Sequence, residues 1–303
     1  MNLFSFTAHF CSEESCRLHF KSQRDQIGVK CMRCGHDQHY WIKSQWSYEC
    51  KSCRSRTSLR SGTIMQSSNL PFLVWYKTMF LMSATKKGFS SKEIQKQLGM
   101  KRYEPVWAMV HKLRKAMGNR DSRYTLEGMI EFDEGYFTVE SSQIEQNKGV
   151  RGRGAAGKQN VAIMAESTPL EDVETGRTDR HCRYFKAKVL KDHTSQEIDA
   201  LLKETIDEQT IVFSDKSTSY LNIADYVELH VTEKSDKQTT TETLKWVHIT
   251  ISNAKRNLLG NYHKIKGKYL QAYLDEFVYK LNRRYFGEKL FDRLVIANIT
   301  AYD

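Results

Sequence analysis

The nine residues MIEFDEGYF at positions 129–137 decide the fold, because they form an apolar stretch of strand-forming residues with acids inside it. A second apolar stretch, TIVFSD at 210–215, also predicts a buried strand and also ends in an acid. The residues around these two stretches predict strands at 161–165, 183–189 and 228–231, and helices at 195–206, 243–259 and 268–285.

Three strands, a helix, a strand and later helices follow one another in the order of a ribonuclease-H-like α+β fold. In that fold the first and fourth strands are neighbours, so we expect Asp133 and Asp215 to converge. A buried acid in an apolar stretch has to be paired or bound to metal. Carboxylate oxygens suit hard divalent cations, and two such cations can promote phosphoryl transfer. The alternative is that both are ordinary acids at strand ends or turns.

Four of the seven cysteines have the spacing of a metal site. Cys31-x2-Cys34 and Cys50-x2-Cys53 are separated by fifteen residues, and two such knuckles offer zinc a tetrahedron of thiolates. Residues 39–42 and 46–49 alternate as the strands of a hairpin do. The sequence therefore predicts a zinc ribbon with structural zinc, and the alternative is four unrelated buried cysteines. An odd number of cysteines argues against a disulfide framework.

A helical region follows the predicted ribbon. Residues 72–83 form one apolar-periodic run, Ser90 and Glu93 have the spacing of a capping box before a helix at 92–98, and Gly99 precedes a helix at 103–116. This order predicts a helix-turn-helix. Its candidate DNA-contacting cations are Lys101, Arg102, Lys112, Arg114 and Lys115. The alternative is a three-helix unit without a DNA role.

The positive charge is unevenly distributed. The chain has a net charge of +11, and residues 1–127 hold 22 Lys and Arg against 9 Asp and Glu, whereas the remainder holds 25 against 27. This asymmetry favours an N-terminal part that binds a polyanion, over the alternative of a basic surface that serves solubility. A basic, glycine-rich loop at 148–158 adds Arg151, Arg153 and Lys158 as candidate contacts to the DNA backbone.

The composition fits a globular protein, with 303 residues of which 40% are hydrophobic. No stretch of eighteen apolar residues and no signal peptide is visible, so a cytoplasmic, DNA-associated protein is expected. We expect four parts: an N-terminal segment at 1–27, the zinc ribbon at 28–66, the helix-turn-helix region at 67–126, and the catalytic domain at 127–303.

These motifs together resemble bacterial insertion-sequence transposases that join a zinc ribbon to an Asp-Asp-Glu (DDE-type) catalytic domain, the group related to Merlin transposons. The resemblance covers about residues 28–286. Its specific pieces are the four cysteines, FDEGY at 132–136, VFSDKS at 212–217, SNAKR at 252–256, and YLDEF at 273–277 running on to NRR at 282–284.

The resemblance implies that Asp133 and Asp215 are the first two catalytic metal ligands, and that Lys255, with Arg256 beside it, contacts DNA. The family's third acid is replaced here by His248, which shares a helical face with Lys255. Imidazole suits manganese better than magnesium. The alternatives are that His248 is a partly buried helix residue beside Trp246, or that Glu242 is the third acid, with Glu134 assisting from the first strand.

The function implied is binding of terminal inverted repeats, followed by Mg²⁺- or Mn²⁺-dependent cleavage and strand transfer into target DNA. A homodimer or larger assembly is implied because two ends have to be brought together. Two alternatives stay open at this point. One is a related nuclease without joining activity, and the other is a DNA-binding regulator whose catalytic domain has decayed.

Overall fold

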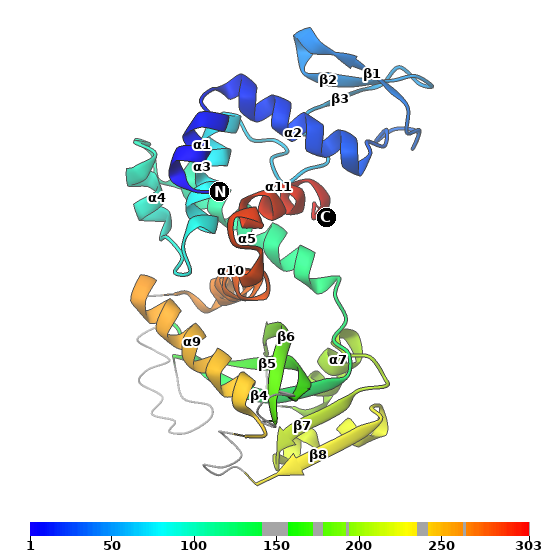
Figure 1. Cartoon of the computed structure of the whole chain (residues 1–303), viewed down its shortest axis with the longest axis vertical. Coiled ribbons are helices and arrows are strands. Elements are labelled where there is room, and N and C mark those ends of the chain that lie inside the picture. Colours follow the sequence, from blue (N-terminus) through cyan, green and yellow to red (C-terminus); the bar gives the residue numbers. More distant parts are fainter. Residues whose placement is uncertain (141–156, 172–177, 192–193, 235–241, 263–264, 303) are drawn as a thin grey trace. The chain divides into compact units, whose positions relative to one another are not determined.

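The computed structural model describes residues 1–140, 157–171, 178–191, 194–234, 242–262 and 265–302 (Figure 1). The chain divides into two compact units, one formed by residues 1–120 with 283–303 and the other by residues 121–282. The predicted four-part division of the chain stays a prediction, and the structure adds that the C-terminal residues fold with the N-terminal unit.

The first unit consists of helices and a small three-stranded sheet. Its helices are α1 (Leu3–His9), α2 (Glu13–Ile27), α3 (Phe72–Ala84), α4 (Ser91–Gln97), α5 (Glu104–Ser122, which ends just beyond this unit) and α11 (Leu290–Thr300), with short 3-10 turns η1 (Lys43–Gln45) and η5 (Arg284–Lys289). The antiparallel sheet has the order β1 (His39–Ile42), β2 (Ser47–Cys50), β3 (Arg56–Ser58). The predicted hairpin and three predicted helices are present, and β3 was not predicted.

The small sheet packs on α2 through aromatic and polar contacts. Tyr48 donates a hydrogen bond from its hydroxyl to Asp25 at 2.8 Å, and the Lys21 ammonium lies 4.8 Å from the centre of the Trp41 ring. Arg24, which is buried, donates to the carbonyls of Ser58 and Leu59. These contacts attach the small sheet to α2.

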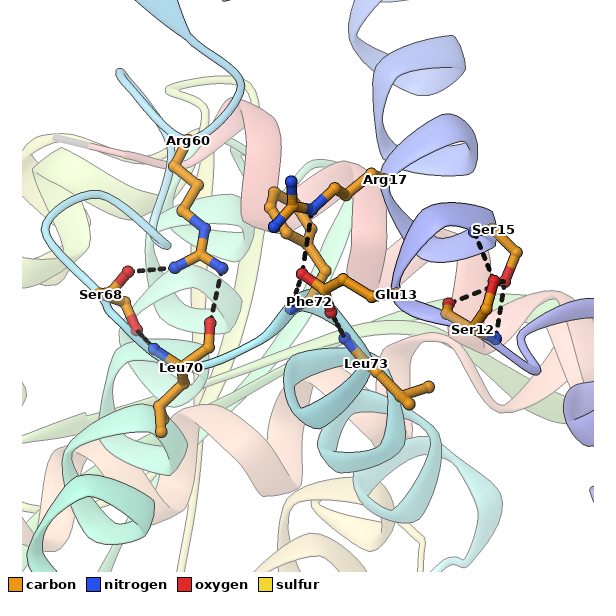
Figure 2. A network of polar contacts seen from close by, with 9 residues as sticks. All are labelled: Ser12, Glu13, Ser15, Arg17, Arg60, Ser68, Leu70, Phe72 and Leu73. Atoms are coloured by element: carbon orange, nitrogen blue, oxygen red, sulfur yellow. Dashed lines mark hydrogen bonds and ion pairs between the residues drawn. The ribbon is translucent and has the colours of Figure 1, made fainter. Parts of the chain in front are cut away.

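A carboxylate far away in the sequence caps α3 (Figure 2). Helix α3 begins at Phe72 after Pro71, which offers no side-chain cap. Instead Glu13 accepts hydrogen bonds from the backbone N–H groups of Phe72 and Leu73, at 3.0 and 2.9 Å. These two bonds and the Arg17 guanidinium outweigh the effect of burial and lower the pKa of Glu13. The carboxylate therefore satisfies two of the N–H groups that a helix start leaves unpaired.

The second unit is built on a five-stranded mixed sheet of order β6-β5-β4-β7-β8. Its elements are β4 (Met129–Thr138), β5 (Lys158–Glu171), β6 (Thr178–Val189), α7 (Ser195–Thr205), β7 (Ile211–Asp215), η2 (Thr218–Tyr220), η3 (Ile223–Asp225), β8 (Leu229–Glu233), α9 (Lys245–Asn261), η4 (Gly267–Tyr269) and α10 (Leu270–Asn282). Strands β4, β5 and β6 are antiparallel neighbours, whereas β7 pairs in parallel with β4. This topology confirms the predicted ribonuclease-H-like α+β fold.

Alternate residues of β4 face the two sides of its sheet. Phe137 packs with α9 and α10, in a cluster that includes Ile163, Val247 and Leu274. Ile130 and Phe132 pack on the other side with α7, in a cluster that includes Leu201 and Tyr220. Odd-numbered residues of β4 therefore face α9, and even-numbered residues face α7.

Gly135 allows α9 to lie close to β4. A Cβ atom at this position would lie 3.2 Å from Cγ2 of Ile251 and 3.2 Å from Cε2 of Phe137. Because both contacts are tighter than ordinary van der Waals packing, a Cβ here would require the side chains of Ile251 and Phe137 to shift.

Helices α1, α2 and α11 were not predicted. In α11, Phe291 is buried, and its ring lies 5.6 Å from that of Phe6 in α1 and 5.7 Å from that of Tyr76 in α3. None of the helices in the described ranges is long and apolar enough to cross a membrane.

Candidate active site

Asp133 and Asp215 lie level with each other on neighbouring parallel strands. The register pairs Glu131 of β4 with Phe213 of β7, so two residues further along each strand lie Asp133 and Asp215. Both are odd-numbered positions on the face that α9 covers. The predicted strands therefore place the two acids level with each other on the same face of the sheet.

The electrostatics of Asp133 reflect burial beside other acids. Burial raises the pKa of Asp133 to about 7, and repulsion from Asp215 and Glu134 adds to this rise. The backbone N–H of Glu134, which donates to Asp133 at 2.7 Å, and the ammonium of Lys255 oppose it. A carboxyl in this state gains from a nearby cation, because the cation stabilises the charged form.

His248 lies on the first turns of α9, close to Asp133. Its Nε2 atom is 3.7 Å from Oδ2 of Asp133, and its side chain is 30% exposed. Burial lowers the pKa of His248, although Asp215 partly opposes the effect. The neutral imidazole is therefore favoured at neutral pH, and this is the form that binds metal ions.

Lys255, two turns further along α9, also lies on the side of β4 that carries Asp133. Its ammonium is 5.7 Å from the centre of the Phe137 ring, and it lowers the pKa of Asp133. Arg256, beside it, is exposed and donates to Asn253 at 2.8 Å.

The two other candidate acids lie elsewhere. Glu134 is even-numbered, so it faces away from α9; it accepts hydrogen bonds from Asn160 and, at 3.2 Å, from the hydroxyl of Tyr220. Glu242 is exposed in the turn before α9.

Tyr220 also lies close to these acids. Burial, together with the carboxylates of Glu134, Asp133 and Asp215, raises the pKa of Tyr220. The sequence did not single out Tyr220 or Asn160, because neither belongs to a recognisable motif.

The four predicted zinc ligands are gathered at one point. The Sγ atoms of Cys31, Cys34, Cys50 and Cys53 all lie within 4.8 Å of one another. Backbone N–H groups of Cys34 and Arg33 lower the pKa of Cys31, whereas, against the opposing effect of the backbone N–H of His36, hydrogen bonds with the neighbouring thiols raise the pKa of Cys34. The thiolate is the form that binds metal. In the described part of the chain this is the one group of His, Cys, Asp and Glu whose ligand atoms are all this close. The Cys₄ cluster fits a zinc ribbon.

The predicted DNA-contacting cations fall into three groups. Exposed ones are Lys101, Arg102, Lys115, Lys158 and Arg256. Lys112 is half-buried and donates to the carbonyl of Gln66 at 2.9 Å, whereas Arg114 is fully buried in the first unit. Arg114 therefore has a packing role in this structure rather than a surface position. Arg151 and Arg153 of the predicted glycine-rich loop lie outside the described residues.

The sheet order is that of a ribonuclease-H-like domain. The family model of the ISXO2-like transposase domain matches residues 125–282, more than half of the chain. The chain therefore belongs to this transposase family, as the sequence motifs predicted. The match spans nearly the whole of the second unit.

No curated protein matches the chain. Among solved structures, it is similar to chains from "Crystal structure of a pre-cleavage Mos1 transpososome" and "Crystal structure of the Mos1 Strand Transfer Complex". Sequence identity is 11% and 10%, the TM-scores are 0.28 and 0.26, and coverage is 70% of this chain and 74% and 73% of those chains. Similarity at this level adds nothing to the family assignment, which rests on the family model.

Proposed function

We propose that this transposase binds the terminal inverted repeats of its element, cuts DNA at their ends in a metal-dependent reaction, and joins the ends to target DNA. One observation carries the proposal. Asp133 and Asp215 lie level on adjacent strands, with His248 of α9 at 3.7 Å from Asp133. The two carboxylates and the imidazole come from three separate elements, β4, β7 and α9.

The donor set fits a divalent cation. Two carboxylates and one neutral imidazole suit Mn²⁺ and are acceptable to Mg²⁺. Repulsion between Asp133 and its acidic neighbours is relieved when a cation is bound. Asp133, Asp215 and His248 would hold the metal, which would supply charge stabilisation for an attacking and a leaving oxygen of a phosphodiester.

Cations of the chain would hold the DNA. Lys255 lies near Asp133 and is suited to a phosphate next to the bond that is cut, and Lys158 at the start of β5 is exposed. The unit of residues 1–120 and 283–303 has 25 Lys and Arg against 10 Asp and Glu, whereas residues 121–282 have 22 against 26. This division supports end binding by the first unit and chemistry in the second.

The test is to incubate the zinc-loaded protein with DNA flanking its own gene and Mg²⁺ or Mn²⁺, and to map the nicks. Cuts at the repeat ends support the proposal. Supplying pre-cut ends with a plasmid then separates a transposase from a nuclease, because only the transposase joins them. Binding without any cut under either metal would favour the decayed regulator, which His248 in place of an acid keeps as the second candidate.

A further inference from the structure

Glu131 is a buried acid in β4 that the proposed reaction does not use. Its residue is fully buried, and it lies two positions before Asp133 on the same face of the strand. Its Oε2 atom accepts hydrogen bonds from the backbone N–H groups of Trp246 and Val247, at 2.7 and 3.1 Å. These two residues directly precede His248.

Helix α9 lacks a cap of its own. Its N-cap residue is Leu244, which makes no side-chain capping bond, and its first turn contains no acid. A helix start leaves N–H groups unpaired and carries a partial positive charge, so a carboxylate stabilises it. Glu131 performs this function from a strand more than 100 residues away in the sequence.

The bonds connect two parts of the candidate metal site. Glu131 and Asp133 are held in place by the backbone hydrogen bonds that pair β4 with β5. The bonds from Trp246 and Val247 to Glu131 hold the first turn of α9, from which His248 projects. One rigid strand therefore sets the position of both a carboxylate and the imidazole.

We propose that Glu131 is a positioning residue. It holds His248 beside Asp133, so that both side chains bind the same cation. This inference rests on the proposed function, since it assumes that His248 binds the metal. Partners that orient metal ligands without binding the metal typically contribute about 10- to 100-fold to metal affinity or activity.

The test compares Glu131→Gln and Glu131→Ala with wild type. Glu166→Gln is the matched control, because Glu166 is a buried carboxylate of the same sheet that also accepts from a backbone N–H, that of Glu127, at 3.2 Å. Among the described residues its hydrogen bonds come from Glu127 and the Tyr124 hydroxyl and not from α9. Three quantities are measured on the zinc-loaded full chain: Mn²⁺ affinity by electron paramagnetic resonance, amide hydrogen exchange of residues 245–250, and end cleavage.

We expect Mn²⁺ affinity to fall by about 10- to 100-fold in Glu131→Ala and by less in Glu131→Gln, whose amide oxygen still accepts a bond. Exchange at Trp246 and Val247 should accelerate in the same order, with Glu166→Gln unchanged in both. Combined with His248→Ala, Glu131→Gln should weaken Mn²⁺ binding no further, because Glu131 acts through His248.

Two results would overturn the inference. One is faster exchange at Trp246 and Val247 with unchanged Mn²⁺ affinity, which would make Glu131 a helix cap and nothing more. The other is an equal loss of Mn²⁺ affinity with and without His248, which would show that the charge of Glu131 acts on the cation directly. If Glu131→Ala fails to fold, Glu131→Gln alone decides both points.

The proposed site itself is tested separately. If Asp133→Asn binds Mn²⁺ as tightly as wild type does, the proposed metal site is refuted. The exchange rates of Trp246 and Val247 still report in that case whether Glu131 holds α9.

Discussion

At the scale of single residues, Asp275 on α10 is a second acid whose pKa the fold raises. Burial raises the pKa of Asp275 to about 7, with Asp121 adding to the rise, while a hydrogen bond from Gln271 and the charge of Lys188 oppose it. The folded protein therefore holds a proton between about pH 4 and 7 that the unfolded chain releases. Stability from this group accordingly rises as pH falls through 7 and is complete below about 4.

Asp275→Asn should stabilise the second unit at pH 8 by on the order of 2 kcal/mol, because it removes a charge in an unfavourable place. The gain should vanish near pH 4. Urea denaturation at pH 8, 6 and 4 measures this, with the exposed Asp225→Asn as a control expected to change little. Destabilisation of equal size at every pH would mean that the carboxylate is needed for packing.

His248 is the residue on which the metal preference depends. His248→Ala should lower end cleavage, less severely with Mn²⁺ than with Mg²⁺. His248→Glu should keep or raise activity with Mg²⁺, because a carboxylate suits this hard cation better than imidazole does. Cleavage rates of the three proteins under each metal decide the point. Equal rates for wild type and His248→Ala would remove His248 from the metal site.

At the scale of elements, the contact of α9 with β4 depends on the missing side chain of Gly135. Gly135→Ala should cost about 1–3 kcal/mol through overpacking against Ile251 and Phe137, and should lower activity because α9 carries His248. Gly260→Ala is the control: no atom lies within 4 Å of its added Cβ, so the better helix former should stabilise α9 slightly. Thermal unfolding measures both, and an unperturbed Gly135→Ala would show that α9 adjusts freely.

The Cys₄ segment makes a separate prediction. Cys34→Ser should lose the bound zinc and unfold β1–β3, since metal binding supplies the folding free energy of such small sites. The exposed Cys11→Ser, outside the cluster, should keep one zinc per chain. Elemental analysis and circular dichroism check this. Full zinc retention in Cys34→Ser would show that these thiolates are not the ligands.

Elements whose signal is local could be predicted from the sequence. The capping box of Ser90 and Glu93 marked the start of α4, and it is present. Asp133 and Asp215 lie in β4 and β7, the strands that their apolar stretches predicted, because a run of strand-forming residues is a short-range signal. Helix α9 was predicted to begin at residue 243, whereas it begins at Lys245. Its start has no local signal, because the N–H groups there are capped by Glu131 of a distant strand. Arg114 was predicted to contact DNA because it lies among other basic residues in the sequence. The structure buries it, and burial depends on tertiary packing that this local pattern does not reveal.

At the scale of the whole molecule, positive charge is concentrated in one of the two units. The balance is +15 in the unit of residues 1–120 and 283–303, and −4 in residues 121–282, from the counts of Lys, Arg, Asp and Glu. If the first unit binds the DNA ends through phosphates, affinity should fall steeply with salt. Loss of a carboxylate in the second unit should leave that affinity intact.

The most direct test of this account is to measure binding and cutting of the same end DNA in one reaction, using wild type, Asp133→Asn and Asp215→Asn with Mn²⁺. We predict that all three bind the end with similar affinity and that only wild type cuts it. Cutting by either variant at the wild-type rate would contradict the assignment of these two acids as the metal ligands of a transposase.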